Sequence, residues 1–344
     1  MLRRILVPLD RSPLAEQALG RAIAIAAASH AGLDVVLVHQ PLSVEGVNGE
    51  PWDRDQFRVE QDYLSGVVAE IESADSIPTT YAVLRGDVVN ALCKRVLESD
   101  IDLVVMTSHG RTGFSRAWLG SVADGLLRHS SAPLLMLPTE RHQAGRATAQ
   151  PLFKKILVPF DGSELASEIL STVVDVARCG DARLTLLQVV RPVPIMTFDI
   201  DLATGFSSGM PFSNSPLITD PEATSQVVAD ATARLASVAD RLRVNDGAVV
   251  ETHVIVNSRI PQAITDFALQ HGVDAIGMST HGRGASRLLV GSVADKIIRG
   301  AGLPVLLRRP VGAEAGGVKC GVSGTQGNAL YGLTAPDIAE IERA

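Results

Sequence analysis

The sequence predicts an α/β protein made of two tandem doubly wound domains, each with a five-stranded parallel sheet. Short apolar runs rich in β-branched residues alternate with segments of helical periodicity, which is typical of βαβ units. Several blocks of sequence occur twice, in the same order, within the 344 residues, which indicates duplication. Aromatic residues make up only 4% of the chain, so Val, Leu, Ile and Ala must build the core, as in strands buried on both faces.

The repeat consists of three separated blocks. The paired blocks are RRILVPLDRS at 3–12 with KKILVPFDGS at 154–163, SHGR at 108–111 with THGR at 280–283, and GSVAD at 120–124 with GSVAD at 291–295. The offset between copies grows from 151 residues at the first block to 172 at the second. The second copy therefore carries about 21 extra residues between these points.

The domain boundaries follow from the repeat and from local composition. The first domain is predicted at 1–138 and the second at 152–309, joined by a polar linker at 139–151. The extra residues fall around 192–222, which is rich in Pro, Ser, Gly and Phe and predicts an irregular insertion. Residues 310–344 form a Gly-rich tail that we expect to be flexible.

The elements of the first copy follow in chain order. Ile5–Leu9 is a short apolar run with β-branched residues, which predicts a strand. Pro13–Ala28 is rich in Ala and Leu at helical spacing and follows Ser12, which can cap it, so it predicts a helix. The same criteria predict strands at Asp34–His39, Thr79–Leu84, Leu103–Thr107 and Pro133–Leu137, and helices at Gln56–Glu72, Val88–Leu97 and Ser121–Arg128.

The second copy is predicted to repeat this order. Its strands are expected at Ile156–Phe160, Arg183–Val190, Val249–Val256, Ala275–Met278 and Pro304–Arg308. Ligands on such sheets bind beyond the carboxyl ends of the strands, where the strand order reverses. This rule selects Asp10 and Asp161, which follow the first strands, and the glycine loops that follow the fourth strands.

The loop after the fourth strand carries the first binding candidates. In the first copy it runs from His109 through Gly110, Arg111 and Gly113 to Gly120. Glycines let a phosphate approach the backbone closely, and Ser121 opens a helix whose free N–H groups favour an anion. A turn followed by a helix cap would explain one copy equally well. The recurrence of the pattern in the second copy favours anion binding.

Charged residues near the loops leave two interpretations open. Asp10 and Asp161 can accept hydrogen bonds from a ribose or a base, or can stabilise the turn before the next helix. Arg111 and Arg283 can neutralise a phosphate or be solvated loop residues. The loop histidines have no partner pattern of a catalyst, so no catalytic residue is predicted.

Several function classes are disfavoured. Neither GxxxxGK[ST] nor a GxGxxG after the first strand is present, and no cluster predicts a metal site. The net charge of −7 argues against a nucleic-acid partner. The three cysteines show no CxxC spacing, and neither a signal-peptide cleavage site nor an apolar stretch of membrane length is found. We expect a cytoplasmic protein without a membrane partner.

These motifs resemble those of the universal stress protein family. ATP-binding members of that family carry an Asp after the first strand and a pattern G-x2-G-x9-G-[ST] after the fourth. Gly110 and Gly120 match the last two glycines of this pattern and are followed by Ser121. Gly282 and Gly291 match them with one residue fewer between, followed by Ser292. The first glycine of the pattern is replaced by Thr107 and by Ser279.

The resemblance implies an adenine nucleotide alpha hydrolase-like fold and an ATP-binding regulator of the stress response with little or no hydrolysis. Backbone amides would hold ATP, and Mg²⁺ would bind through the phosphates. A stress scaffold that binds no nucleotide, or a slow ATPase, is the alternative. The fifth strands of the two copies would pair within the chain, and the chain would form a homodimer. The implied binding residues are Pro8, Asp10, Val38, Val88, Thr107, Gly110, Arg111, Gly113, Gly120, Ser121 and Val122, and in the second copy Pro159, Asp161, Val189, Ser279, Gly282, Arg283, Gly291, Ser292 and Val293.

Overall fold

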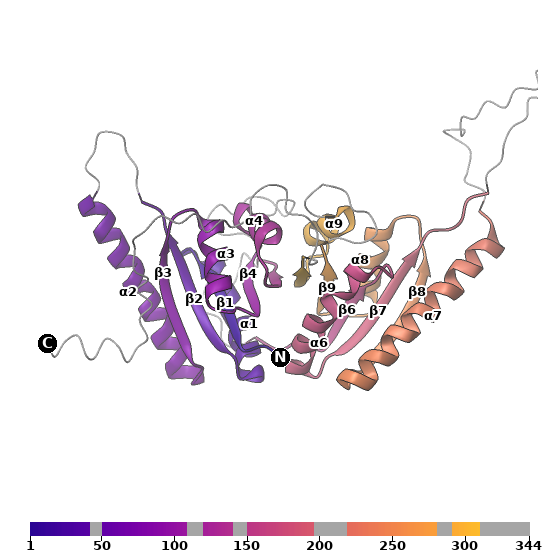
Figure 1. Ribbon diagram of the computed structural model, residues 1–344, viewed down its shortest axis with the longest axis horizontal. Helices are drawn as coiled ribbons and strands as arrows, with labels where there is room; N and C mark the ends of the chain where they lie inside the picture. The colour runs from indigo at the N-terminus through magenta and orange to yellow at the C-terminus, as the bar shows by residue number, and fades with distance from the viewer. Residues whose placement is uncertain (42–49, 109–119, 140–149, 196–218, 281–290, 310–344) are drawn as a thin grey trace, which may run out of the picture.

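A computed structural model gives the fold of the chain (Figure 1). It describes residues 1–41, 50–108, 120–139, 150–195, 219–280 and 291–309. The predicted flexible tail and the centres of the predicted linker and insertion lie outside these residues.

One ten-stranded sheet runs through both halves in the order β3-β2-β1-β4-β5-β10-β9-β6-β7-β8. The strands of the first half are β1 (Arg4–Leu9), β2 (Gly32–His39), β3 (Thr79–Arg85), β4 (Leu103–Thr107) and β5 (Leu134–Leu137). Those of the second are β6 (Lys155–Pro159), β7 (Arg183–Val190), β8 (Val250–Val256), β9 (Ala275–Ser279) and β10 (Val305–Arg308). Strands within each half pair in parallel, so each half is the predicted five-stranded parallel sheet.

Helices cover both faces of the sheet. They are α1 (Pro13–Ser29), α2 (Glu50–Asp75), α3 (Val88–Glu98), α4 (Ser121–His129), α5 (Glu164–Ser167), α6 (Ile169–Gly180), α7 (Pro221–Asp246), α8 (Ile260–Gln270) and α9 (Ser292–Gly300). Buried side chains of α1, α2, α6 and α7 form one core cluster, and those of α3, α4, α8 and α9 form another. The two clusters lie on opposite faces, because successive strand residues alternate between them: Ile5 and Val7 join the first, and Leu6 joins the second. The fold is therefore doubly wound, as predicted.

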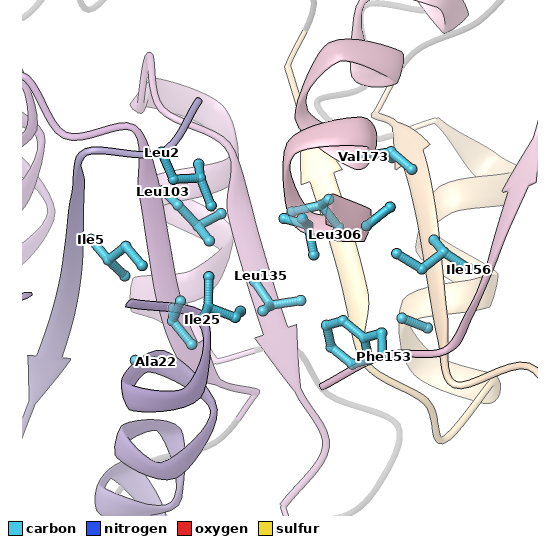
Figure 2. Packing of buried hydrophobic residues seen from close by; sticks show 14 of the residues in the cluster. Leu2, Ile5, Ala22, Ile25, Leu103, Leu135, Phe153, Ile156, Val173 and Leu306 are labelled. Atoms are coloured by element: carbon cyan, nitrogen blue, oxygen red, sulfur yellow. The ribbon is translucent and has the colours of Figure 1, made fainter. Parts of the chain in front are cut away.

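The halves join through their fifth strands. β5 and β10 pair antiparallel, with Leu135 opposite Leu306. Both leucines are buried in the core cluster that extends from Ile5 to Ile156, so the two halves share a core across the junction (Figure 2). The pairing of the fifth strands predicted from the family resemblance is confirmed.

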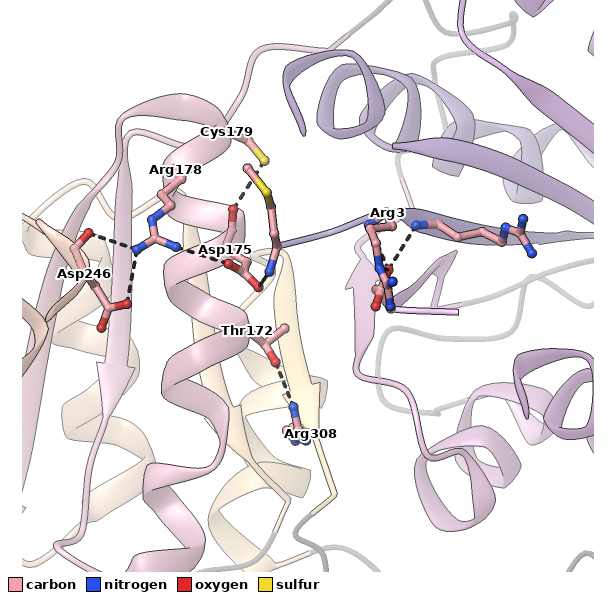
Figure 3. A network of polar contacts seen from close by, with 10 residues as sticks. Arg3, Thr172, Asp175, Arg178, Cys179, Asp246 and Arg308 are labelled. Atoms are coloured by element: carbon pink, nitrogen blue, oxygen red, sulfur yellow. Dashed lines mark hydrogen bonds and ion pairs between the residues drawn. The ribbon is translucent and has the colours of Figure 1, made fainter. Parts of the chain in front are cut away.

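Polar contacts reinforce the junction at the surface. The amino group of Met1 lies 2.6 Å from the Asp175 carboxylate of α6, which places the N-terminus against the second half (Figure 3). The guanidinium of Arg21 lies 4.4 Å from the centre of the Phe153 ring and donates to the carbonyl of Pro151. The first contact joins the N-terminus to α6, and the other two join α1 to the segment that precedes β6.

Two helices differ from the sequence prediction. The helix expected at Gln56–Glu72 is α2, which is longer at both ends (Glu50–Asp75). In the second half the helix after the first strand is interrupted at Glu168, between α5 and α6, whereas α1 is continuous. The described ends of the expected insertion meet in a bridge between Pro194 and Thr219, and Asp220 caps α7 with its side chain. α7 thus begins inside the range predicted to be irregular.

Candidate functional site

The strand order places a candidate site at the carboxyl ends of the central strands in each half. β1 lies between β2 and β4, and β6 lies between β7 and β9. Chain connections leave to opposite sides at β1 and β6, so the loops at their carboxyl ends spread apart and create space for a ligand. Asp10 and Asp161 follow these two strands directly.

Both aspartates stabilise the same turn. The Asp10 Oδ1 accepts a hydrogen bond from the Ser12 backbone N–H at 2.9 Å. The Asp161 Oδ1 accepts from the Ser163 N–H at 3.0 Å and from its hydroxyl at 2.7 Å. The turn needs a left-handed residue, which is Arg11 (φ 66°) in the first half and Gly162 (φ 81°) in the second. The turn-stabilising role is therefore observed, and it leaves each carboxylate beside the candidate site.

The helices after the fourth strands begin alike. Gly120 precedes α4 and Gly291 precedes α9, each in an extended conformation (ψ 148° and 146°). Each glycine N–H donates back to the chain just after the strand, from Gly120 to Ser108 O at 3.2 Å and from Gly291 to Thr280 O at 2.8 Å. Neither helix start has a side-chain cap, so its first N–H groups can bind an anion. Ser121 and Ser292 open their helices, as predicted.

In the second half, a cavity of about 630 Å³ gathers the predicted residues. Those that line it are Pro159, Asp161, Val189, Ser279, Gly291, Ser292 and Val293. They come from β6, β7, β9 and α9, which meet only in the folded chain. The volume is typical of a site for a small organic ligand.

The cavity has walls of two kinds. Apolar side chains from the α8 side form one wall, including Val189, Ile260 and Ile264. Polar groups also line the cavity: the start of α9, the hydroxyl-bearing Ser279 and Thr280, and the side chains of Gln188, Arg191 and Arg234. An apolar slot beside a helix N-terminus can hold a planar base and its phosphates together.

Sequence reasoning missed part of this lining. The residues not selected as binding candidates are Phe160, Ala166, Leu187, Val190, Arg191, Val227, Arg234, Ile260, Ile264, Met278, Thr280 and Ala294. Ile260 is the first residue of α8, as Val88 is of α3, so the predicted role of Val88 pointed to this position. The residues of α7 follow the predicted insertion, and no motif in the sequence marks them.

The predicted residues of the first half occupy equivalent places. Val38, Val88 and Val122 pack against the same core cluster, Pro8 is the last residue but one of β1, and Thr107 ends β4. Gly110, Arg111 and Gly113, like Gly282 and Arg283, lie outside the described residues. Among the described helices, none is long and apolar enough to cross a membrane.

Comparison with known proteins gives the same fold and a family. The sequence profile of the universal stress protein family matches residues 1–138 and 207–309. The second match begins inside the expected insertion, although β6, α5, α6 and β7 precede it. A universal stress protein of Thermus aquaticus is 30% identical over 159 residues, which are 46% of this chain and 100% of that protein.

Other relatives are more distant in sequence. A universal stress protein of Methanocaldococcus jannaschii is 27% identical over 158 residues, covering 45% of this chain and 82% of that protein. The crystal structure of a universal stress protein from Archaeoglobus fulgidus superposes with a TM-score of 0.64 at 19% identity. It covers 89% of this chain and 98% of that chain, so the similarity extends over both halves.

Proposed function

The chain belongs to the universal stress protein family, and from this premise we propose that it is an ATP-binding regulator of the stress response. The observation that carries the proposal is the cavity of the second half. Seven residues that the family resemblance implies, on or next to β6, β7, β9 and α9, line this one space of about 630 Å³. The lining offers an apolar slot for a base, the Asp161 carboxylate after β6 for a ribose, and the uncapped N-terminus of α9 for phosphates.

The base would lie between Val189 and the start of α8, and the phosphates would lie at Gly291 and Ser292. The backbone N–H groups of the first turn of α9 and the Ser292 hydroxyl would donate to phosphate oxygens. Mg²⁺ would bind mainly through the phosphates and water. The first half would bind in the same manner through Asp10 and Ser121.

We propose that hydrolysis is slow or absent. Among the described residues that line the cavity, Asp161 is the sole carboxylate, and none is a histidine or cysteine. The Asp161 carboxylate already accepts two hydrogen bonds from Ser163. A general base must reach the attacking water, and this lining supplies no second candidate for that role.

The test is the nucleotide content of the purified chain, followed by titration of stripped protein with ATP and Mg²⁺. We expect ATP binding, with two molecules per chain if both halves bind. Ser292→Ala and Ser121→Ala form a matched pair, and each should weaken one site by about tenfold, because each removes one charge-assisted hydrogen bond. No binding at millimolar ATP would contradict the proposal and favour the scaffold, whereas steady phosphate release would favour the ATPase.

Two further expectations belong to this proposal. We propose a cytoplasmic protein, which Cys93 and Cys179 support because neither forms a disulfide among the described residues, as expected in a reducing compartment. We also propose that the whole chain forms a homodimer. Sedimentation equilibrium over a range of concentrations checks the dimer, and a mass of one chain throughout would contradict it.

A further inference from the structure

The cavity of the second half is lined by two cationic side chains that come from the end of β7 and from α7 rather than from the start of α9. Arg191 follows β7 directly, and Arg234 lies in the middle of α7. Both are exposed, and in the described part of the chain neither has a recorded hydrogen bond or ion pair. Among the described residues, these two positive charges in the cavity lining therefore have no recorded partner.

A buried amide adds a second, independent observation. Gln188 is 5% exposed and lines the cavity, and its Oε1 is buried without a hydrogen-bond partner. An unpaired buried carbonyl oxygen is costly, and such groups are rare in folded proteins. Among the described residues, this acceptor beside the cavity thus keeps hydrogen-bonding capacity that a ligand with a donor group can use.

The arginines and the helix start lie on opposite sides of the site. β7 and α7 pack together at one side, while α9 follows β9 on the other. In the sheet order β9-β6-β7, two strand spacings separate β9 from β7, which is about 10 Å. A nucleotide with phosphates on two different ribose positions can contact both sides, because the long arginine side chains span part of this separation.

The first half lacks these groups at the equivalent positions. The β1–β2 and β6–β7 registers pair Pro8 with Val36 and Pro159 with Leu187. Counting onward from these pairs, Gln188 replaces Leu37 and Arg191 replaces Gln40. α2 and α7 both have 26 residues, and aligning them end to end places Arg234 at the position of Tyr63, whose hydroxyl donates to Glu16 at 2.7 Å.

We propose that the second half binds a nucleotide that carries a second phosphate away from its 5′-phosphates. Arg191 and Arg234 bind the second phosphate, and Gln188 accepts a hydrogen bond from a ribose hydroxyl or a base amine. The ligand class includes nucleoside 3′,5′-bisphosphates and dinucleotides, which share this chemistry. The inference rests on the proposed function, because it places the 5′-phosphate at α9.

Calorimetric titration of the full chain with adenosine 3′,5′-bisphosphate and with ADP tests the proposal. The two probes carry the same number of phosphates and differ in where the second one lies. We expect one site per chain to prefer the bisphosphate by at least tenfold, since two guanidinium–phosphate contacts are added. The double variant Arg191→Gln/Arg234→Tyr, which installs the residues of the first half, should abolish this preference and leave ADP binding unchanged.

Control variants test whether the preference for the bisphosphate comes from the side chains of the cavity or from the overall charge of the protein. Arg241→Gln removes an exposed charge on α7 from a residue that does not line the cavity, and it should keep the preference. Gln188→Leu should weaken both probes, because the ligand loses an acceptor. Unchanged melting temperatures establish that the exposed arginine variants are folded.

The outcomes distinguish this inference from the proposed function. Equal affinity for the two probes, with ATP still bound, overturns the inference and leaves ATP binding standing. Binding of the bisphosphate without binding of ATP overturns the proposed function and supports the inference. A preference that survives in the double variant overturns the assignment to these arginines.

Discussion

In the first half, a buried network of hydrogen bonds links the end of β2 to α2. The His39 Nδ1 and Nε2 lie 2.7 Å from the Glu60 and Asp53 carboxylates, and the His39 side chain is only 2% exposed. In the second half Val190 and Ala231 hold the positions of His39 and Glu60, and Val190 lines the cavity. The same topology thus carries a hydrogen-bonded network at this position in one half and part of the cavity lining in the other.

A second contrast lies on the opposite face of the sheet. Asp34 is fully buried and binds the Arg95 guanidinium through two hydrogen bonds of 2.7 and 2.9 Å. This hydrogen bonding raises the pKa of Arg95. The corresponding residues of the second half are Thr185 and Phe267, and Phe267 stacks on His271 with ring centres 3.8 Å apart. Duplicated domains can therefore keep one backbone while exchanging a charged contact for an apolar one.

The largest effect is expected from breaking the buried ion pair. Arg95→Met leaves the Asp34 carboxylate without its cationic partner, so we expect a loss of about 3–5 kcal/mol in unfolding free energy. Urea unfolding followed by circular dichroism measures it.

The control comes from the second half. Arg183 and Glu251 form an exposed pair, so Arg183→Met should cost less than about 1 kcal/mol. The double variant Asp34→Thr/Arg95→Met, which removes both charges, should recover most of the stability. An equal loss in the single and double variants would mean that packing, rather than charge, dominates.

A smaller effect is expected from opening the polar network. Glu60→Ala installs the residue of the second half and leaves a buried ring nitrogen of His39 unpaired, at a cost of about 1–3 kcal/mol. His39→Val/Glu60→Ala should cost less than the sum of the two single variants, because both partners are removed together. Urea unfolding of the four proteins gives the coupling energy, and strict additivity would show that the two groups do not stabilise each other.

The smallest effect is expected at the turn after the first strand. Gly162→Ala places a side chain at φ 81° and should cost about 1 kcal/mol, since left-handed backbone is strained for other residues. Arg11→Gly at φ 66° should relieve similar strain, offset by the greater freedom of glycine in the unfolded chain. Thermal unfolding compares them, and a stabilising Gly162→Ala would show that the turn tolerates a side chain.

Much of the fold was predictable because local patterns carry it. Leu103–Thr107 and Arg183–Val190 form strands with the predicted bounds, and the other strands differ by at most two residues at an end. The helix interruption at Glu168 was not predictable, because no breaking residue stands there. α2 begins at Glu50, before the predicted start at Gln56, because the first residues of this helix do not follow the apolar periodicity on which the prediction was based.

The candidate site was predictable only where a motif recurs. The repeated GSVAD blocks identified Ser121 and Ser292 at helix starts, and the repeated Asp identified both turns. Arg234 and Ile264 line the same cavity without any motif, since they reach it from α7 and α8.

The sequence by itself determined the duplication, the parallel strand order of each half and the helix starts at the carboxyl edge, because repeated blocks and local periodicity specify them. The family resemblance implied the pairing of the fifth strands, and the tertiary structure decided its antiparallel register, with Leu135 opposite Leu306, in one continuous sheet. It also decided that, among the described residues, Gln188 keeps a buried oxygen without a hydrogen-bond partner in the lining of a cavity that Arg191 and Arg234 share. The physical reason is that a cavity depends on side-chain volumes at facing positions of distant segments, and those distances exist only after the chain has folded.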